Sequence, residues 1–204
     1  MDRAAAKEKI LLATLPHVPT DGWTQRALVA GARDAGFGAD VAMRAFPDGM
    51  GAVVDFMSAY FDARTQAALA KGDFARMRVR ERVAAGVRLR LDLVRPHREA
   101  MRRSLAFRLL SPNAGSATGA AWRTASAIWY ATGDESTDFN YYTKRAILVG
   151  VYVATTLYWL DDRSEDCADT WAFLDRRIAN AMAMPKLDPR SILGCCLRAL
   201  PIAG

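Results

Sequence analysis

The longest apolar pattern in the chain lies between Gly133 and Asp162, in the stretch GDESTDFNYYTKRAILVGVYVATTLYWLDD. Steps of four and three residues place one set of side chains on a single helical face: Tyr141, Arg145, Leu148, Tyr152, Thr155 and Trp159. The opposite side is nearly as apolar, with Tyr142, Ala146, Val149, Val153, Leu157 and Leu160. A helix that is apolar all round needs two buried sides. We therefore expect one side in the protein core and the other against a ligand, a second subunit or a partner protein.

Polar residues mark both ends of this predicted helix. Four side chains near its start suit helix N-caps: Asp134, Ser136, Thr137 and Asp138. Asp161 and Asp162 end the apolar run, and capping and solubility explain these carboxylates more simply than catalysis does.

Helical spacing also predicts most of the remaining chain. The predicted helices are residues 3–17, 24–35, 39–46, 50–71, 114–132, 169–182 and 191–200, with a further helix opening at Pro96. Asp73 is expected to cap a helix that runs to Arg95, and Asp166 to cap the helix at 169–182. Two inward stripes follow, Val79, Val83, Val87 and Leu91 in one helix and Trp171, Leu174, Ile178 and Met182 in the other. No run reads as a strand, so the predicted class is all-α.

Near the N-terminus, two short predicted helices are joined by the turn at residues 35–38 and followed by a long one. This order resembles the N-terminal module of TetR-type regulators and implies a TetR-like fold of about nine or ten helices. A DNA reader needs polar side chains on the second short helix, yet that helix offers only Asp40 and Arg44. We therefore predict a degenerate helix-turn-helix and no nucleic-acid partner. A TetR-type transcriptional regulator with a hydrophobic ligand pocket is the alternative function.

Length and composition suit a globular protein with one substantial core. The chain has 204 residues, of which 51% are hydrophobic and 25% charged. We expect three regions: a helix-turn-helix-like module at 1–48, a helical core at 49–186, and an apolar C-terminal segment at 187–204. The N-terminus has no targeting pattern, and the longest apolar run, residues 146–160, is shorter than the roughly 20 residues a spanning helix needs.

The net charge of +6 is concentrated in one segment. Eleven arginines between Arg76 and Arg108 stand against three acidic residues. A solvated helix face is the favoured interpretation, and anionic lipid head groups are the second. Nucleic acid comes last, because no aromatic residues interleave with the arginines as stacking platforms.

The sequence offers no catalytic or metal-binding pattern. The two histidines, His17 and His97, are far apart, and the three cysteines, Cys167, Cys195 and Cys196, form no CxxC motif. We predict a binding protein with no catalytic residues, no metal and no cofactor. An enzyme acting on a lipid is a third hypothesis. The last segment carries an apolar stripe that predicts either an arm docked on the body or an interfacial membrane helix.

The stretch GDESTDFNYYTKRAILVGVY, followed by DTWAFLDRRIANAM, resembles the Coq-nine family of ubiquinone-biosynthesis accessory proteins. The resemblance implies a TetR-like all-α homodimer that does not regulate DNA and that binds isoprenoid lipids in an apolar pocket. It makes residues 49–186 the lipid-binding and dimerisation core. It also implies association with membranes and support of the demethoxyubiquinone hydroxylase by presentation of its substrate, a ubiquinone precursor. The lack of a transit peptide favours a bacterial member, and with the implied membrane association the expected location is cytoplasmic, peripheral on the inner membrane.

Three sets of site residues follow. Matched to the family's partner-binding patch, the hydroxylase-binding residues are Asp138, Asn140, Tyr141, Tyr142 and Arg145. Apolar faces select the expected lipid-binding residues, Trp122, Ile128, Trp129, Leu148, Tyr152 and Trp171. The expected membrane contacts are Ile192, Leu193, Leu197 and Leu200.

Overall fold

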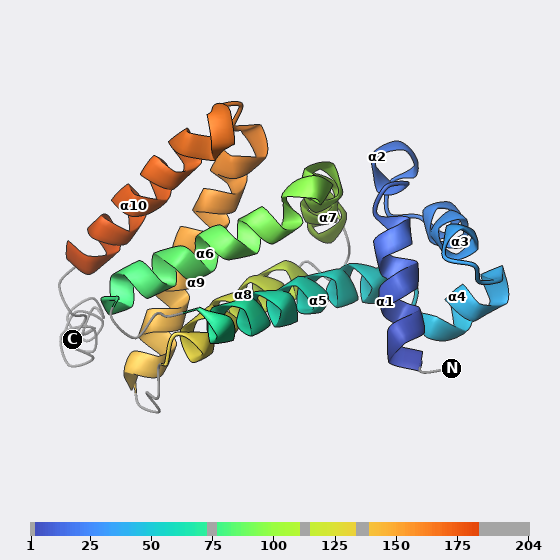
Figure 1. Cartoon of the computed structure of the whole chain (residues 1–204), viewed down its shortest axis with the longest axis horizontal. Helices are drawn as coiled ribbons and strands as arrows, with labels where there is room; N and C mark the ends of the chain where they lie inside the picture. The colour runs from blue at the N-terminus through green and yellow to red at the C-terminus, as the bar shows by residue number, and fades with distance from the viewer. Residues whose placement is uncertain (1–2, 73–76, 111–114, 134–138, 184–204) are drawn as a thin grey trace, which may run out of the picture.

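The computed structural model describes residues 3–72, 77–110, 115–133 and 139–183 (Figure 1). These residues form ten α-helices, two short 3-10 helices and no strand, which confirms the all-α prediction. The elements in chain order are α1 Arg3–Thr14, α2 Val18–Asp21, α3 Gln25–Asp34, α4 Ala39–Ala45, α5 Met50–Lys71, α6 Val79–Val94, η1 Arg95–His97, α7 Arg98–Leu110, α8 Gly115–Ala131, α9 Phe139–Asp161, η2 Glu165–Cys167 and α10 Ala168–Ala183.

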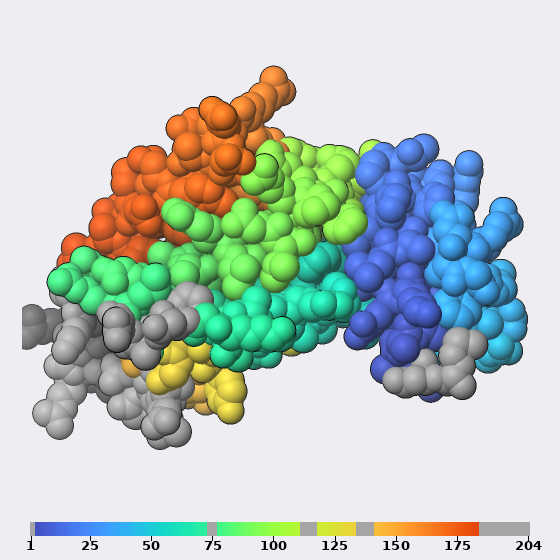
Figure 2. All heavy atoms as spheres, in the orientation of Figure 1, coloured from blue at the N-terminus to red at the C-terminus, as the bar shows by residue number. Residues whose placement is uncertain are grey.

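Helices α1–α4 gather at one end of the molecule, and α5 runs from them into a larger bundle (Figures 1 and 2). Helices α1 and α3 approach so closely that a Cβ added to Gly31 would lie 2.5 Å from the backbone nitrogen of Thr14. The indole of Trp23 donates a hydrogen bond to the Ala100 carbonyl of α7 at 3.1 Å, with both residues buried. This end is therefore packed onto the bundle rather than tethered to it.

The larger bundle consists of α5, α6, α8, α9 and α10, with α7 closing the side toward α2 (Figure 1). Its core includes Val87, Leu91, Ile128, Trp159 and Leu174, all nearly fully buried. Apolar spacing explains this arrangement, because each helix turns its stripe toward the same centre.

The two sides of α9 differ as the double apolar pattern predicts. Five of the six residues on the first face are buried, and the first, Tyr141, is half-buried. On the opposite side Tyr142, Val153 and Leu157 are exposed although they are large and apolar. This helix therefore has one side in the core and surplus apolar surface on the other.

Several expected helix ends are wrong. The first helix ends at Thr14 rather than at residue 17, and a separate short helix, α2, follows. Helix α6 begins at Val79, because the Glu81 carboxylate caps it by accepting a hydrogen bond from the Arg78 amide at 3.0 Å. Asp73, the expected cap, lies outside the described residues, as do the expected caps of α9 and the segment at 191–200.

Asp166 does not cap α10. It lies within η2, with a φ of 48°, and its side chain accepts a hydrogen bond from Arg95 at 3.1 Å. The capping carboxylate belongs to Asp162, which accepts hydrogen bonds from the Ser164 amide at 2.7 Å, the Thr170 amide at 2.9 Å and both hydroxyls. Burial acts to raise the pKa of Asp162, but the bonds from Ser164 and Thr170 outweigh it and lower the pKa to about 2.

The arginine-rich segment is a solvated face only in part, since Arg78, Arg80 and Arg88 are exposed whereas two other arginines are not. Arg90 and Arg108 are buried, with 1% and 4% of their surface exposed. Conversely, Val79 and Met182 are exposed although both were assigned to inward stripes. Helix ends explain these two, because Val79 is the first residue of α6 and Met182 lies one residue before the end of α10.

Candidate functional site

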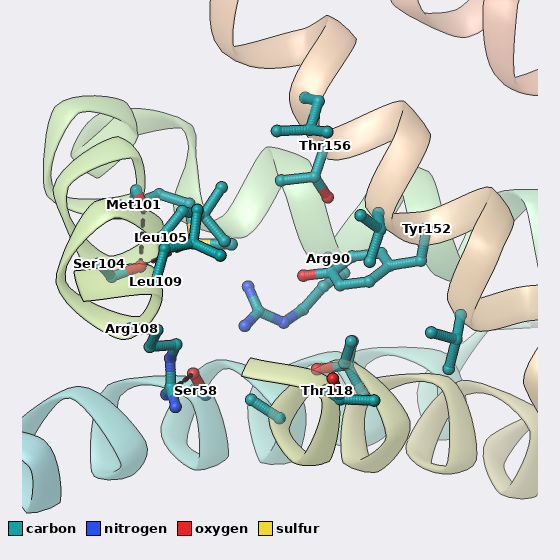
Figure 3. A pocket seen from close by; sticks show the side chains of 16 residues that line it. Ser58, Arg90, Met101, Ser104, Leu105, Arg108, Leu109, Thr118, Tyr152 and Thr156 are labelled. Carbon is teal, nitrogen blue, oxygen red and sulfur yellow. Dashed lines mark hydrogen bonds between the residues drawn. The ribbon is translucent and has the colours of Figure 1, made fainter. Parts of the chain in front are cut away.

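A cavity of about 310 Å³ lies between α5, α6, α7, α8 and α9 (Figure 3). It lies on the side of α9 that carries the surplus apolar residues, together with Tyr152 and Thr156. Its lining residues are Ser58, Arg90, Met101, Ser104, Leu105, Arg108, Leu109, Thr118, Ala120, Ala121, Thr124, Val149, Tyr152, Val153, Thr156 and Leu157.

Apolar side chains form most of the cavity wall, and three of them also reach the surface. Leu109 of α7 is 71% exposed, and Val153 and Leu157 of α9 are exposed as well. Since these residues both line the cavity and face solvent, the cavity opens beside them. We call Leu109, Val153 and Leu157 the mouth of the cavity.

The floor of the cavity holds a buried ion pair. Arg90 of α6 donates from Nε to Oδ1 of Asp62 on α5 at 2.8 Å, and the two side chains are 1% and 9% exposed. The Thr124 hydroxyl of α8 donates to the same carboxylate, at 2.9 Å to Oδ1 and 3.1 Å to Oδ2. The pair and Thr124 therefore join three helices beneath the cavity.

One nitrogen of Arg90 has no protein partner. Its Nη1 atom is buried and makes no hydrogen bond to any residue in the described ranges. Figure 3 shows the guanidinium projecting into the cavity. Burial acts to lower the pKa of Arg90, but Tyr152 and Asp62 outweigh it and raise the pKa above its ordinary value. The guanidinium is therefore charged and keeps an unused donor.

Two hydroxyl groups on α9 share this part of the wall. Tyr152 reaches from α9 toward Arg90 (Figure 3). Thr156 follows one turn later, and its Oγ1 is buried without a hydrogen-bond partner among the described residues. An unused cationic donor and a nearby unused hydroxyl in an apolar wall can bind oxygen atoms of a ligand.

Arg108 lines the cavity from α7 and is held on the α5 side. It donates from Nη1 to Asp55 Oδ1 at 2.7 Å and from Nη2 to the Ser58 hydroxyl at 3.2 Å. Asp55 also pairs with Arg123 of α8 at 3.2 Å, so the two arginines share one carboxylate.

Of the six residues expected to bind lipid, only Tyr152 lines this cavity. Ile128 is a core residue of α8 that packs against Gly86 of α6, where an added Cβ would lie 2.7 Å from Ile128 Cγ2. Leu148 is likewise buried in the core. Both side chains were selected for apolar faces, and that property marks core packing as well as ligand contact.

The three tryptophans of that set lie elsewhere. Trp122 stacks on Tyr142, with ring centroids 6.3 Å apart. Trp129 donates to the Lys144 carbonyl at 3.1 Å and so ties α8 to α9. Trp171 donates to the Asp166 carbonyl at 2.8 Å and lies under Arg88.

The expected hydroxylase-binding residues lie in part on the first turns of α9. Tyr142 is 62% exposed, and its ring meets that of Tyr141 edge-on at 5.0 Å. Arg145 is buried, with its guanidinium carbon 3.4 Å from the centroid of the Tyr141 ring. Tyr142 thus offers contact surface, and Arg145 supports the aromatic ring beside it.

The remaining expected residues cannot be placed. Asp138 and the membrane set Ile192, Leu193, Leu197 and Leu200 lie outside the described residues, and so does the side chain of Asn140. Among the described helices, none combines the length and apolar character needed to cross a membrane. Among the described residues, no three histidine, cysteine, aspartate or glutamate side chains form a cluster that could hold a metal ion.

The second short helix of the N-terminal module is α4. Its two polar side chains bond to each other, with Arg44 Nη2 2.7 Å from Asp40 Oδ2. Arg44 is exposed but has a carboxylate beside it, which lowers the positive charge that a phosphate would meet.

The fold is similar to that of a solved bacterial protein. A crystal structure of the TetR transcriptional regulator from Nitrosomonas europaea superposes with a TM-score of 0.70 at 18% identity, covering 87% of this chain and 98% of that one. This similarity shows that the fold is TetR-like, as predicted.

Sequence comparison gives a more specific relationship. The ubiquinone biosynthesis protein COQ9, mitochondrial, of Rattus norvegicus is 34% identical over 185 residues, and the Homo sapiens protein of the same name is 32% identical over 184. Each match covers 87% of this chain, which spans 59% and 58% of the two relatives. The family model COQ9 matches residues 114–185, and the model of the ubiquinone biosynthesis protein COQ9 N-terminal domain matches residues 5–33. The chain belongs to the COQ9 family.

Proposed function

We propose that this chain is a lipid-binding accessory protein of ubiquinone biosynthesis, which binds an isoprenoid quinone precursor and presents it to the demethoxyubiquinone hydroxylase. The observation that carries lipid binding is the cavity of about 310 Å³ with its apolar wall and open mouth. Ligand sites in proteins commonly have volumes of roughly 300 to 1,000 Å³. Membership of the COQ9 family supports the place in ubiquinone biosynthesis.

The size of the cavity decides how a long lipid would sit. Each buried CH₂ group contributes about 0.8 kcal/mol, so a few isoprene units supply several kcal/mol. A volume near the lower end of the usual range holds a ring and the first part of a tail. The rest of the tail leaves past Leu109, Val153 and Leu157, whose exposed apolar surface can cover it.

We assign the binding surface for the hydroxylase to the first turns of α9. Exposed tyrosines are frequent anchors of protein interfaces, and Tyr142 is exposed beside Trp122 and Tyr141. Arg145 stacks on Tyr141 and donates to its carbonyl at 3.2 Å, which holds this ring in place. We further propose that the protein acts as a homodimer at a membrane surface.

Lipid binding is tested by extracting the purified protein and identifying lipids by mass spectrometry. Val153→Trp places a large ring at the mouth, and Val79→Trp makes the same change at an exposed valine far from the cavity lining. The wild type and Val79→Trp should carry isoprenoid lipid, and Val153→Trp should carry several-fold less. Repeated lipid-free extracts of the wild type, together with failure to bind liposomes, would refute the proposal.

Presentation is tested by capture of the purified hydroxylase. Tyr142→Ala should reduce capture at least tenfold, because hot-spot tyrosines typically contribute about 2 kcal/mol or more. The matched control is Tyr158→Ala, which removes another exposed tyrosine from the far end of the same helix. Equal capture by wild type and Tyr142→Ala would show that the hydroxylase binds elsewhere.

A further inference from the structure

We infer that Arg90, Tyr152 and Thr156 form a receptor for a neutral oxygen atom on the ring of the bound lipid, and that Arg90 is its central donor. The receptor selects isoprenoids with a carbonyl, ether or phenol head group over hydrocarbon and anionic ones. This inference rests on the proposed lipid binding in the same cavity and adds the chemical class of the head group.

The first argument is the unused donor. A buried guanidinium nitrogen without a partner is costly, since leaving a charged donor unsatisfied forfeits the hydrogen bond it would otherwise make. Arg90 Nη1 is such an atom, and the side chain is only 1% exposed. Because the guanidinium lines the cavity, an oxygen atom of a ligand can satisfy it (Figure 3).

The second argument is convergence from two helices. Arg90 enters the cavity from α6, whereas Tyr152 and Thr156 enter from successive turns of α9. The Thr156 hydroxyl is also unsatisfied, and Tyr152 reaches toward the guanidinium (Figure 3). Two or more of these groups can therefore donate hydrogen bonds to one ring or its substituents.

The third argument is charge balance, which disfavours an anionic head group. The Arg90 charge already has the Asp62 carboxylate at 2.8 Å. Arg108 has Asp55 at 2.7 Å, a carboxylate that it shares with Arg123 at 3.2 Å. An anion would have to lose its hydration without gaining a free counter-charge, and it would lie near Asp62. A neutral acceptor gains a charge-assisted hydrogen bond without that cost.

The test measures binding of three probes with the same two-isoprene tail by titration calorimetry: a geranyl-substituted benzoquinone, geranylbenzene and geranyl phosphate. Wild-type protein should bind the quinone at least tenfold more tightly than either other probe. Removing Arg90 alone would leave Asp62 unpaired, so the variant is the double substitution Asp62→Leu with Arg90→Met, which removes both charges together and leaves neither partner unpaired.

The double variant should lose about tenfold to hundredfold in affinity for the quinone and keep its affinity for geranylbenzene. Thr156→Val should weaken quinone binding several-fold. Thr155→Val is the matched control, because Thr155 is equally buried and also has an unsatisfied hydroxyl, but does not line the cavity. It should leave the quinone affinity unchanged.

Three outcomes would overturn the inference. An equal loss for quinone and hydrocarbon in the double variant would mean that Arg90 acts only on cavity shape. Tighter binding of the phosphate than of the quinone by wild type would show an anion site instead. If the quinone and geranylbenzene bind wild type equally, the head group is not read, although lipid binding itself stands. Only failure of all three probes to bind would refute the proposed function as well.

Discussion

Arg90 and Asp62 are bonded at 2.8 Å across α6 and α5, and both are buried beneath an apolar cavity. They lie 28 residues apart, and each sits on the inward side of its own helix. An ion pair in this position stabilises the fold only while both partners are present, and it leaves one donor for a ligand.

Replacing one partner of this pair should destabilise the protein far more than replacing both. Arg90→Met and Asp62→Leu should each lower the free energy of unfolding by about 3–5 kcal/mol, because each leaves a buried charge unpaired. The double substitution should return to within about 1 kcal/mol of wild type or exceed it. Urea denaturation measures all four proteins. Additive single effects would show that the two charges are not coupled in solution.

The exposed Asp40–Arg44 pair on α4 is the control for these substitutions of the buried pair. Arg44→Ala removes a partner of Asp40 that is largely solvent-exposed. Its cost should be below about 0.5 kcal/mol. A cost equal to that of Arg90→Met would mean that burial does not set the difference.

Asp162→Asn should destabilise the protein at neutral pH and change its acid sensitivity. The folded-state pKa of Asp162 is lowered to about 2, so its stabilisation is present above the unfolded value near 4 and is lost as the pH falls toward 2. The variant should lose on the order of 1–2 kcal/mol at pH 7, and the gap should close between pH 4 and pH 2. Denaturation curves at several pH values measure this.

The neighbouring Asp161→Asn provides the comparison. Asp161 is exposed and pairs with Arg102 at 2.8 Å on the surface. Its replacement should change stability by less than about 0.5 kcal/mol at any of these pH values. A pH-independent loss in Asp162→Asn would show that lost packing, not the carboxylate charge, is responsible.

Gly31→Ala should weaken the contact between α1 and α3. The added Cβ would meet the Thr14 backbone at 2.5 Å, and a backbone atom cannot rotate away. We expect a loss of about 1–3 kcal/mol. Gly150→Ala is the matched change, because this glycine is also helical and has open space around its Cβ position. It should raise stability by about 0.5–1 kcal/mol. Thermal unfolding of wild type and both variants measures these changes in stability.

The N-terminal module is expected to bind duplex DNA only weakly and without sequence preference. Asp40 lies 2.7 Å from Arg44, so α4 presents little free positive charge. Fluorescence anisotropy with random-sequence duplexes should give affinities that fall steeply between 50 and 200 mM salt, in line with phosphate contacts alone. Selective nanomolar binding at 200 mM salt would favour a transcriptional regulator.

Sequence patterns found the helices but misjudged several residues on them. The stripe Val83, Val87, Leu91 was visible, and Arg90 falls three residues after Val87 on the same face. Its position on the apolar face indicates that Arg90 is buried, whereas the high density of arginines around it favours a solvated face. Asp62 gives the same signal beside Phe61 and Thr65 on α5, where all three are buried.

Five of the six expected lipid-binding residues do not line the cavity, for a related reason. Trp122, Trp129 and Trp171 are large and apolar, and these properties alone do not say what an aromatic ring will contact. In the structure their rings face Tyr142, Lys144 and Arg88. Small and polar residues that sequence periodicity does not single out, such as Ala121 and Thr156, line the cavity instead.

The sequence by itself determined the all-α class, most helix positions, the membership of the family, and a central helix with more apolar surface than one core can bury. Periodicity carries this information because it reports which side of a helix avoids water. Only the tertiary structure decided that the surplus side of α9 opens onto a cavity and that Arg90 lies beneath it with one donor unused. The reason is physical: periodicity fixes the direction a side chain faces along its own helix, whereas the partner it meets depends on how five helices pack together.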